Sequence, residues 1–229
     1  MTRLVPTRRR SRRHIFLLIS LLCAIAGAVD LLAYFRLGQV FVANLTGNTV
    51  LFAYHAAARH WVPAAVRLGL ILAFFSGVIS NRGLNRWFQS ENVGLNPAVV
   101  SLGIECGLLC SLALVSAPGH LRIALLLSLA WAMGLQNDAF QKIGPVNLNT
   151  TFLTGDIEKL GITVASPANN AERRRQRRTR IAGFLTAWTA YVAGAVLGAI
   201  GNHFLELRAL LIPAAMAALV IVLELTGRA

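Results

Sequence analysis

Two carboxylates within apolar stretches are the side chains best suited to chemistry in this chain. They are Asp30 and Asp138, and each is followed sixteen residues later by a Thr-Gly pair, Thr46-Gly47 and Thr154-Gly155 respectively. A carboxylate near the middle of a membrane helix costs about 2.5–3.5 kcal/mol on insertion, so such a residue usually has a use. Two uses are open: binding of a proton or cation, or a structural hydrogen bond to broken backbone in the other half of the chain.

The Thr-Gly pairs predict helix starts that can receive a ligand. An extended linker precedes each pair, at residues 38–44 and 144–151, where Gly, Pro, Val and Thr interrupt a helix. The free N–H groups and positive dipole end of a helix start attract anions or carbonyl oxygens. A Thr hydroxyl can cap such a start, and a Gly beside it lets a ligand approach closely. The alternative is that Thr only caps and Gly only packs.

Amide and hydroxyl side chains beside these signatures complete the set of candidate binding residues. They offer hydrogen-bond donors as well as acceptors. The predicted substrate-binding or ion-binding residues are Asp30, Asn44, Thr46, Gly47, Asn48, Gln136, Asn137, Asp138, Thr151, Thr154 and Gly155, with Glu105 and Asp156 in second rank.

Enzymatic and metal chemistry have no support in the residue pattern. The chain contains no Ser-His-Asp set and no phosphate-binding loop, and no Cys or His spacing near Cys106 and Cys110 completes a metal site. We therefore expect a protein that is not an enzyme, with no metal and no cofactor. Cys23 also lies in an apolar stretch, where a thiol behaves as a small hydrophobe, so no disulfide is expected.

Apolar stretches recur along the chain and predict a membrane protein. Apolar residues make up 56% of the sequence and charged residues only 14%, far from the balance of a soluble domain. About twenty apolar residues span a hydrocarbon layer of roughly 30 Å as a helix. Two shorter stretches, 46–58 and 152–165, carry polar residues that suit half-helices. Six stretches are near full spanning length: 15–37, 63–81, 97–117, 121–137, 181–203 and 207–225.

Two arginine-rich clusters, at residues 8–13 and 173–180, carry most of the net charge of +13 and predict the orientation. Each cluster immediately precedes an apolar span. Arg and Lys near span ends hold loops in the cytoplasm, so both clusters should face inward, where they can also contact anionic lipid. Neither cluster has interleaved aromatic residues to stack bases, so we expect no nucleic-acid partner.

Two topologies satisfy this constraint, because the number of crossings between the clusters must be even. If 46–58 and 152–165 are re-entrant, the chain has six spans, the repeats have opposite orientation, and Arg86 is cytoplasmic. If both stretches cross, there are eight spans, the repeats are parallel, and Arg86 lies outside while Arg59 faces in. The first arrangement keeps more loop arginines inside, and it is the one we predict.

The expected fold class is an all-α membrane protein with about six transmembrane helices plus two shorter broken or re-entrant helices, arranged as two internal repeats. A basic cytoplasmic tail covers residues 1–13, and the membrane repeats cover 14–117 and 118–229, the second with an Arg-rich cytoplasmic loop at 166–180. Gly194 and Gly198 have the Gly-x-x-x-Gly spacing that brings helices close. This contact could lie within one chain or between subunits of a homo-oligomer.

Several motifs in order resemble the YoaK-like family of bacterial membrane proteins. The resemblance covers nearly the whole chain and implies an integral, multi-pass protein of the bacterial cytoplasmic (inner) membrane. That family is one of unknown function, so the resemblance implies a location and a fold but no substrate. Its pattern often has a small residue in place of Asp138, which implies that Asp30 is the typical acid. The motifs are Gly27-Ala28-Val29-Asp30, Gly38, Phe41, Asn44, Thr46-Gly47-Asn48, Gly134-Leu135-Gln136-Asn137 and Thr150-Thr151-Phe152-Leu153-Thr154-Gly155.

Together these features predict a small secondary transporter or permease for an unknown small solute or proton, with both termini cytoplasmic. Its site would lie where the two broken segments meet near the midplane, with Asp30 as the coupling or proton site. The same parts can serve a channel. The alternative is a non-transporting membrane scaffold that recruits a partner or anionic lipid through the Arg-rich loop at 166–180.

Overall fold

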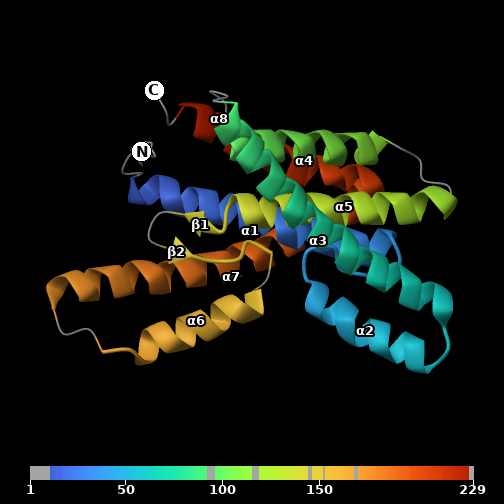
Figure 1. Cartoon of the computed structure of the whole chain (residues 1–229), viewed down its shortest axis with the longest axis horizontal. Helices are drawn as coiled ribbons and strands as arrows, with labels where there is room; N and C mark the ends of the chain where they lie inside the picture. Colours follow the sequence, from blue (N-terminus) through green and yellow to red (C-terminus); the bar gives the residue numbers. More distant parts are fainter. Residues whose placement is uncertain are drawn as a thin grey trace.

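The computed structural model describes residues 11–91, 96–114, 119–143, 146–151, 153–167 and 170–226. The first ten residues of the expected basic tail lie outside these ranges. The described chain is helical almost throughout (Figure 1). Its elements are α1 (Arg12–Arg36), α2 (Leu45–Ala57), α3 (Trp61–Ser90), α4 (Pro97–Leu114), α5 (Gly119–Ala139), β1 (Lys142–Ile143), β2 (Val146–Asn147), α6 (Leu153–Ala165), α7 (Ala171–Leu205), the 3₁₀ helix η1 (Glu206–Leu210) and α8 (Leu211–Thr226).

Long apolar helices dominate the fold. Within the described residues, α1, α3, α4 and the stretch from α7 to α8 are long and apolar enough to cross a membrane. The surface of α3 shows why water is not their solvent, because large apolar side chains are exposed at helical spacings of three and four: Leu68, Leu72, Phe75 and Ile79. Such a stripe is the lipid-facing side of a membrane helix. The protein is therefore embedded in a lipid bilayer.

The apolar stretches of the sequence all form helices. Each of the six stretches of near-spanning length overlaps one of α1, α3, α4, α5, α7 and α8, and the two shorter stretches form α2 and α6. Both short helices have 13 residues, which corresponds to about 20 Å at 1.5 Å per residue. They are too short to cross a hydrocarbon layer of roughly 30 Å.

The arginine-rich segment differs from the sequence-based expectation. Residues 171–180, predicted as part of a loop, form the first turns of α7. The side chain of Asn170 caps this helix by accepting a hydrogen bond from the Arg173 N–H at 2.8 Å, and Arg, Glu and Gln are good helix formers. The basic cluster is therefore a helical extension of a membrane helix rather than a flexible loop.

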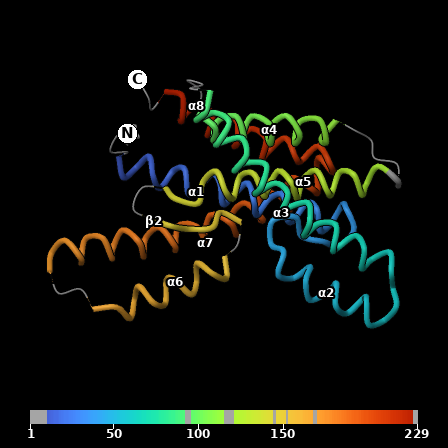
Figure 2. Tube along the Cα trace, viewed as in Figure 1, coloured from blue at the N-terminus to red at the C-terminus, as the bar shows by residue number. Residues whose placement is uncertain are grey.

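Helices far apart in sequence form the core pairs. α1 packs along α7, α3 packs along α5, and α4 packs along α8, while the short helices α2 and α6 pack on α3 and α7 respectively. Figures 1 and 2 show α2 and α6 along the lower edge of the molecule, with α2 directed to the right and α6 to the left. The two short helices thus point away from each other.

Glycines allow the α1–α7 and α3–α5 pairs to cross in backbone contact. A Cβ atom at Gly27 would lie 2.1 Å from the carbonyl oxygen of Tyr191, and one at Gly194 would lie 2.0 Å from that of Ala24. At the other crossing, a Cβ at Gly134 would lie 2.2 Å from the carbonyl oxygen of Phe74. The Gly-x-x-x-Gly motif that begins at Gly194 therefore faces α1 within the same chain.

The two linkers differ in form. The first turns sharply, because Gly38 and Gln39 both have positive φ, at 115° and 56°. The second folds back on itself as an antiparallel pair of two-residue strands, β1 and β2. Both linkers bring buried apolar residues back against the bundle, including Val42 and Val146.

Candidate functional site

Asp30 holds the first linker in place. Its Oδ1 accepts hydrogen bonds from the N–H groups of Val42 and Ala43, both at 2.7 Å, and its Oδ2 accepts one from the Asn44 N–H at 3.0 Å. The hydroxyl of Tyr191 on α7 donates to Oδ2 at 2.5 Å. The side chain is 2% exposed at the level of the whole residue. Four donors from the protein therefore occupy this carboxylate, and three of them are backbone groups that a membrane would leave unpaired.

Asn48 and Asp156 do the same work one turn into each short helix. Asn48 exchanges two hydrogen bonds with the backbone of Phe41, accepting from its N–H at 3.3 Å and donating to its carbonyl oxygen. Asp156 accepts from the Asn149 N–H at 3.0 Å and pairs with Lys159 at 3.1 Å. Both side chains are buried, so both bind their own linkers rather than facing an open space.

Gln136 ties the second linker to the core. Its Nε2 donates to the Leu22 carbonyl oxygen of α1 at 3.1 Å and to the Thr150 hydroxyl at 3.2 Å. Three buried oxygens nearby have no hydrogen-bond partner among the described residues: Gln136 Oε1, Asn137 Oδ1 and Thr151 Oγ1. This region of α5 and its linker thus contains acceptors that a ligand can use.

A pocket of about 430 Å³ lies where the start of α2 meets the second linker. The polar side chains in its wall are uncharged, namely Thr46 and Thr49 of α2, Asn137 of α5 and Asn149 of the second linker. No side chain caps the start of α2, so the first N–H groups of this helix remain available to a ligand. The apolar part of the wall consists of Ala43, Leu45, Val50 and Phe74.

The structure brings together only part of the predicted site. Thr46 and Asn137 line this pocket, whereas Asn44 lies beside Asp30 and Gly47 packs near the ring of Phe41. The second Thr-Gly pair is elsewhere, with Thr154 exposed on α6. A second, smaller hollow of about 310 Å³ lies between α6 and α7, and its wall is largely apolar. The two Thr-Gly pairs therefore do not form one site.

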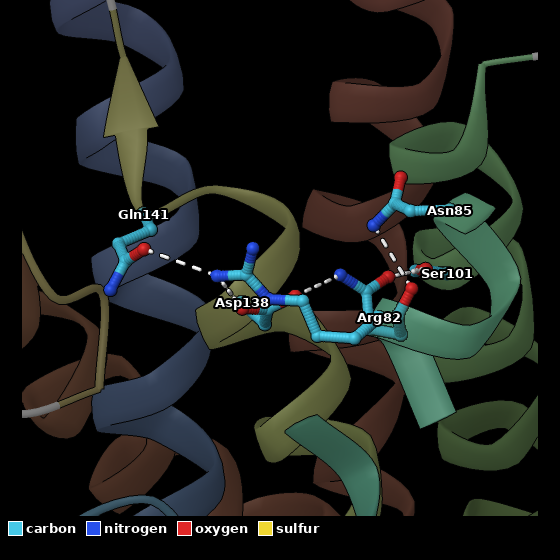
Figure 3. Close-up of polar contacts among 6 residues, drawn as sticks. Arg82, Asn85, Ser101, Asp138 and Gln141 are labelled. Carbon is cyan, nitrogen blue, oxygen red and sulfur yellow. Dashed lines mark hydrogen bonds and ion pairs between the residues drawn. The ribbon is translucent and has the colours of Figure 1, made fainter. Parts of the chain in front are cut away.

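Asp138 belongs to a separate polar cluster at the end of α5 (Figure 3). It pairs with Arg82 at 2.7 Å and accepts a hydrogen bond from the Asn81 side chain at 2.7 Å. Asn81 in turn accepts from the Ser101 hydroxyl of α4 at 2.6 Å. The Asp138 side chain is 4% exposed and that of Arg82 is 58% exposed, so Asn81 is the better-shielded partner. Asp138 joins α3, α4 and α5 and does not hold a linker as Asp30 does.

Glu105 is an isolated acid within the bundle. The residue is fully buried in α4, and neither carboxyl oxygen has a hydrogen-bond partner among the described residues. It does not line the pocket at α2. Among the described residues, no three His, Cys, Asp or Glu side chains are grouped so that they could hold a metal ion.

Sequence reasoning missed several residues that shape this region. Tyr191 donates to Asp30, and Phe74 and Asn149 line the pocket. No local signal identifies Tyr191 or Phe74, since both act through helix pairing. Arg67 could have been found, because a single arginine within an apolar stretch marks a functional position by its cost alone.

The fold and the pocket define a polytopic α-helical membrane protein with broken helices and a polar pocket. The chain belongs to the family described as "Protein of unknown function (DUF1275)", which matches residues 18–223. It is 35% identical over 150 residues to the UPF0700 transmembrane protein YoaK of Bacillus subtilis (strain 168), a match that covers 62% of this chain and 64% of that protein. The match thus spans slightly less than two thirds of the relative's length. No solved structure matches the chain. The resemblance to YoaK-like proteins is confirmed.

Proposed function

We propose that this protein is a small secondary transporter or permease of the bacterial cytoplasmic membrane, built from two inverted repeats. Its substrate site is the pocket at the start of α2. One observation carries this proposal: a pocket with uncharged polar walls lies where a broken helix of one half meets the linker of the other half. Discontinuous helices whose ends open into a pocket between repeats recur in transporters.

The glycine crossings support the repeat. Gly134 follows Gly27 by 107 residues, and the carbonyl partners Phe74 and Tyr191 are 117 residues apart. The α3–α5 crossing therefore has the same construction as the α1–α7 crossing with the halves exchanged. The short helices agree, since Asn48 and Asp156 are 108 residues apart, as are their backbone partners Phe41 and Asn149. In this register Asp30 corresponds to Asn137, one residue before Asp138.

Contacts at the helix ends support opposite orientation of the repeats. At one end, Arg12 of α1 donates to Thr179 near the start of α7, which groups the two arginine clusters together. At the other end, Arg122 of α5 donates to the Arg36 carbonyl oxygen at the end of α1, at 2.9 Å. α1 and α5 therefore begin at opposite ends. With both clusters in the cytoplasm, the chain crosses six times, the two short helices re-enter, and both termini are cytoplasmic.

Cysteine accessibility tests this topology. In a background with the native cysteines Cys23, Cys106 and Cys110 replaced by Ser, we expect Arg86→Cys to react only after permeabilisation and His60→Cys to react in intact spheroplasts with a membrane-impermeant maleimide. Both positions are exposed. The opposite pattern would establish eight crossings and parallel repeats, and would remove the inverted arrangement.

The pocket favours a small uncharged or zwitterionic solute with hydrogen-bonding groups. Its walls contain hydroxyls and amides but no ionised side chain. Asn137 Oδ1 is buried without a partner among the described residues and can accept from a substrate donor, while the open N–H groups at the start of α2 can donate to a substrate oxygen. Asp30 shapes this site through the linker and does not face the solute.

Thr46→Leu tests the pocket. We expect at least a tenfold loss of solute flux in proteoliposomes, because the added methyl groups fill the pocket and remove a hydroxyl, and tenfold corresponds to only about 1.4 kcal/mol. Thr154→Leu is the matched control, since Thr154 is exposed in the second Thr-Gly pair. Flux would be measured across a panel of small amides, polyols and amino acids. Wild-type flux equal to that of empty liposomes, or unchanged flux in Thr46→Leu, would remove the proposal.

A scaffold that recruits a partner remains the alternative function. It is favoured by the helical arginine extension at the start of α7, whose residues are mostly exposed. A scaffold would give no flux for any solute in the same proteoliposomes. The assay therefore separates the two functions.

A further inference from the structure

Arg67 is buried in the interface between α2 and α3, well inside the apolar part of α3. The residue is 8% exposed and lies six positions after the first residue of its helix. Side chains on a helix lean toward its N-terminus, and the guanidinium accordingly donates to the Pro63 carbonyl oxygen, at 3.3 Å. The charge therefore lies at the level of the first turn of α3.

This guanidinium has no anionic partner among the described residues. Its Nε is buried without a hydrogen bond, and the long contact to Pro63 is the one hydrogen bond that the described structure gives it. The sequence contains no acidic residue between Asp30 and Glu91, and the Asp30 carboxylate is occupied by four donors. A buried cation without a counter-charge costs several kcal/mol. An anion from outside the chain would remove that cost.

Two histidines lie beside Arg67 and add donors to the same place. His55, in the last turn of α2, is close enough to feel the charge of Arg67, and its Nδ1 is buried without a partner among the described residues. The rings of His55 and His60 are 5.7 Å apart. His60 begins α3, and no side chain caps the start of that helix. Arginine, imidazole and free helix N–H groups all suit an oxyanion.

We propose that Arg67, His55 and His60 form a binding site for a phosphate group. The position favours the phosphate of an anionic lipid headgroup. Tyr54 and Trp61, which flank the site in sequence, are 60% and 67% exposed, and such aromatic residues lie at the membrane–water interface. The guanidinium fork can bind two phosphate oxygens at once. The site is distinct from the solute pocket and does not depend on transport.

Thermal unfolding of the delipidated full-length protein in a neutral detergent tests this site. The two probes are phosphatidylglycerol, compared with diacylglycerol in the same micelles, and inorganic phosphate, compared with chloride at equal ionic strength. We expect phosphatidylglycerol to raise the Tm of the wild type by on the order of 5 °C. In Arg67→Gln we expect this rise to disappear. Arg86→Gln, which removes an exposed charge from the same helix, should keep it.

The Tm without phosphate separates binding from a structural role. Because Arg67→Gln removes an uncompensated buried charge, the variant should be at least as stable as the wild type when no phosphate is present. A response to phosphatidylglycerol alone assigns the site to a lipid, and a response to inorganic phosphate assigns it to a free anion. The proposal is overturned if neither probe stabilises the wild type, if Arg67→Gln responds as the wild type does, if Arg86→Gln loses the response equally, or if Arg67→Gln is destabilised without phosphate.

Discussion

Replacement of Asp30 by Asn should destabilise the protein by about 3 kcal/mol or more, with a fall in Tm of roughly 10 °C. The carboxylate accepts from three backbone N–H groups and the Tyr191 hydroxyl. An amide at this position has one oxygen acceptor, and its NH₂ group would face donors that it cannot satisfy. The freed linker should also become cleavable by chymotrypsin at Phe41. Thermal unfolding in detergent and limited proteolysis measure the two effects.

Tyr191→Phe is the control for this experiment. It removes the phenolic donor and leaves the three backbone donors to Asp30 in place, so we expect a loss of only about 1 kcal/mol and no cleavage at Phe41. If Asp30→Asn unfolds at the wild-type temperature, the carboxylate does not hold the linker. The assignment of Asp30 as a solute or proton site would then regain its support.

Gly27→Ala should have a comparable effect through helix packing. The added methyl group would lie 2.1 Å from the Tyr191 carbonyl oxygen and 3.1 Å from the Ala195 nitrogen. Both are backbone atoms, so α1 and α7 must separate. Overpacking of this kind costs about 1–3 kcal/mol, and separation also stretches the Tyr191–Asp30 hydrogen bond, which lies one turn along α1. We expect a total loss of about 3 kcal/mol, measured as Tm and as the monodisperse fraction in gel filtration.

Gly103→Ala provides the matched control. Nothing lies within 4 Å of a Cβ atom at Gly103, so the substitution should be neutral or should stabilise α4 by up to about 1 kcal/mol, the difference in helix propensity. Gly134→Ala, at the α3–α5 crossing, should resemble Gly27→Ala. Equal stability of Gly27→Ala and Gly103→Ala would show that the crossing tolerates a wider spacing than the structure has.

Local signals predicted the helices well. Apolar length and turn residues identified all eight α-helices of the described chain, including the two short ones, because these signals act within a few residues of one another. The extended linkers were predicted for the same reason. The helical form of residues 171–180 was missed, since a charged run was interpreted from its polarity alone and the cap at Asn170 was overlooked.

The candidate site was predicted less completely. Asp30 and Asp138 are sixteen residues before matching Thr-Gly pairs, yet one binds a linker and the other binds Arg82 and Asn81. Sequence spacing could not separate these roles, because a shift of one residue on a helix turns a side chain by about 100° toward another neighbour. The glycine crossings, which set the register between halves, depend on backbone approach between helices distant in sequence.

What the sequence determined by itself is the class of protein, the positions of its helices and the places where they break. These follow from the cost of exposing polar backbone to lipid, which each segment meets alone. The tertiary structure decided which donors occupy Asp30, which residues line the pocket, and that Arg67 has no acid beside it among the described residues. Those outcomes depend on the pairing of α1 with α7 and of α3 with α5, and such long-range contacts leave no local pattern in the chain.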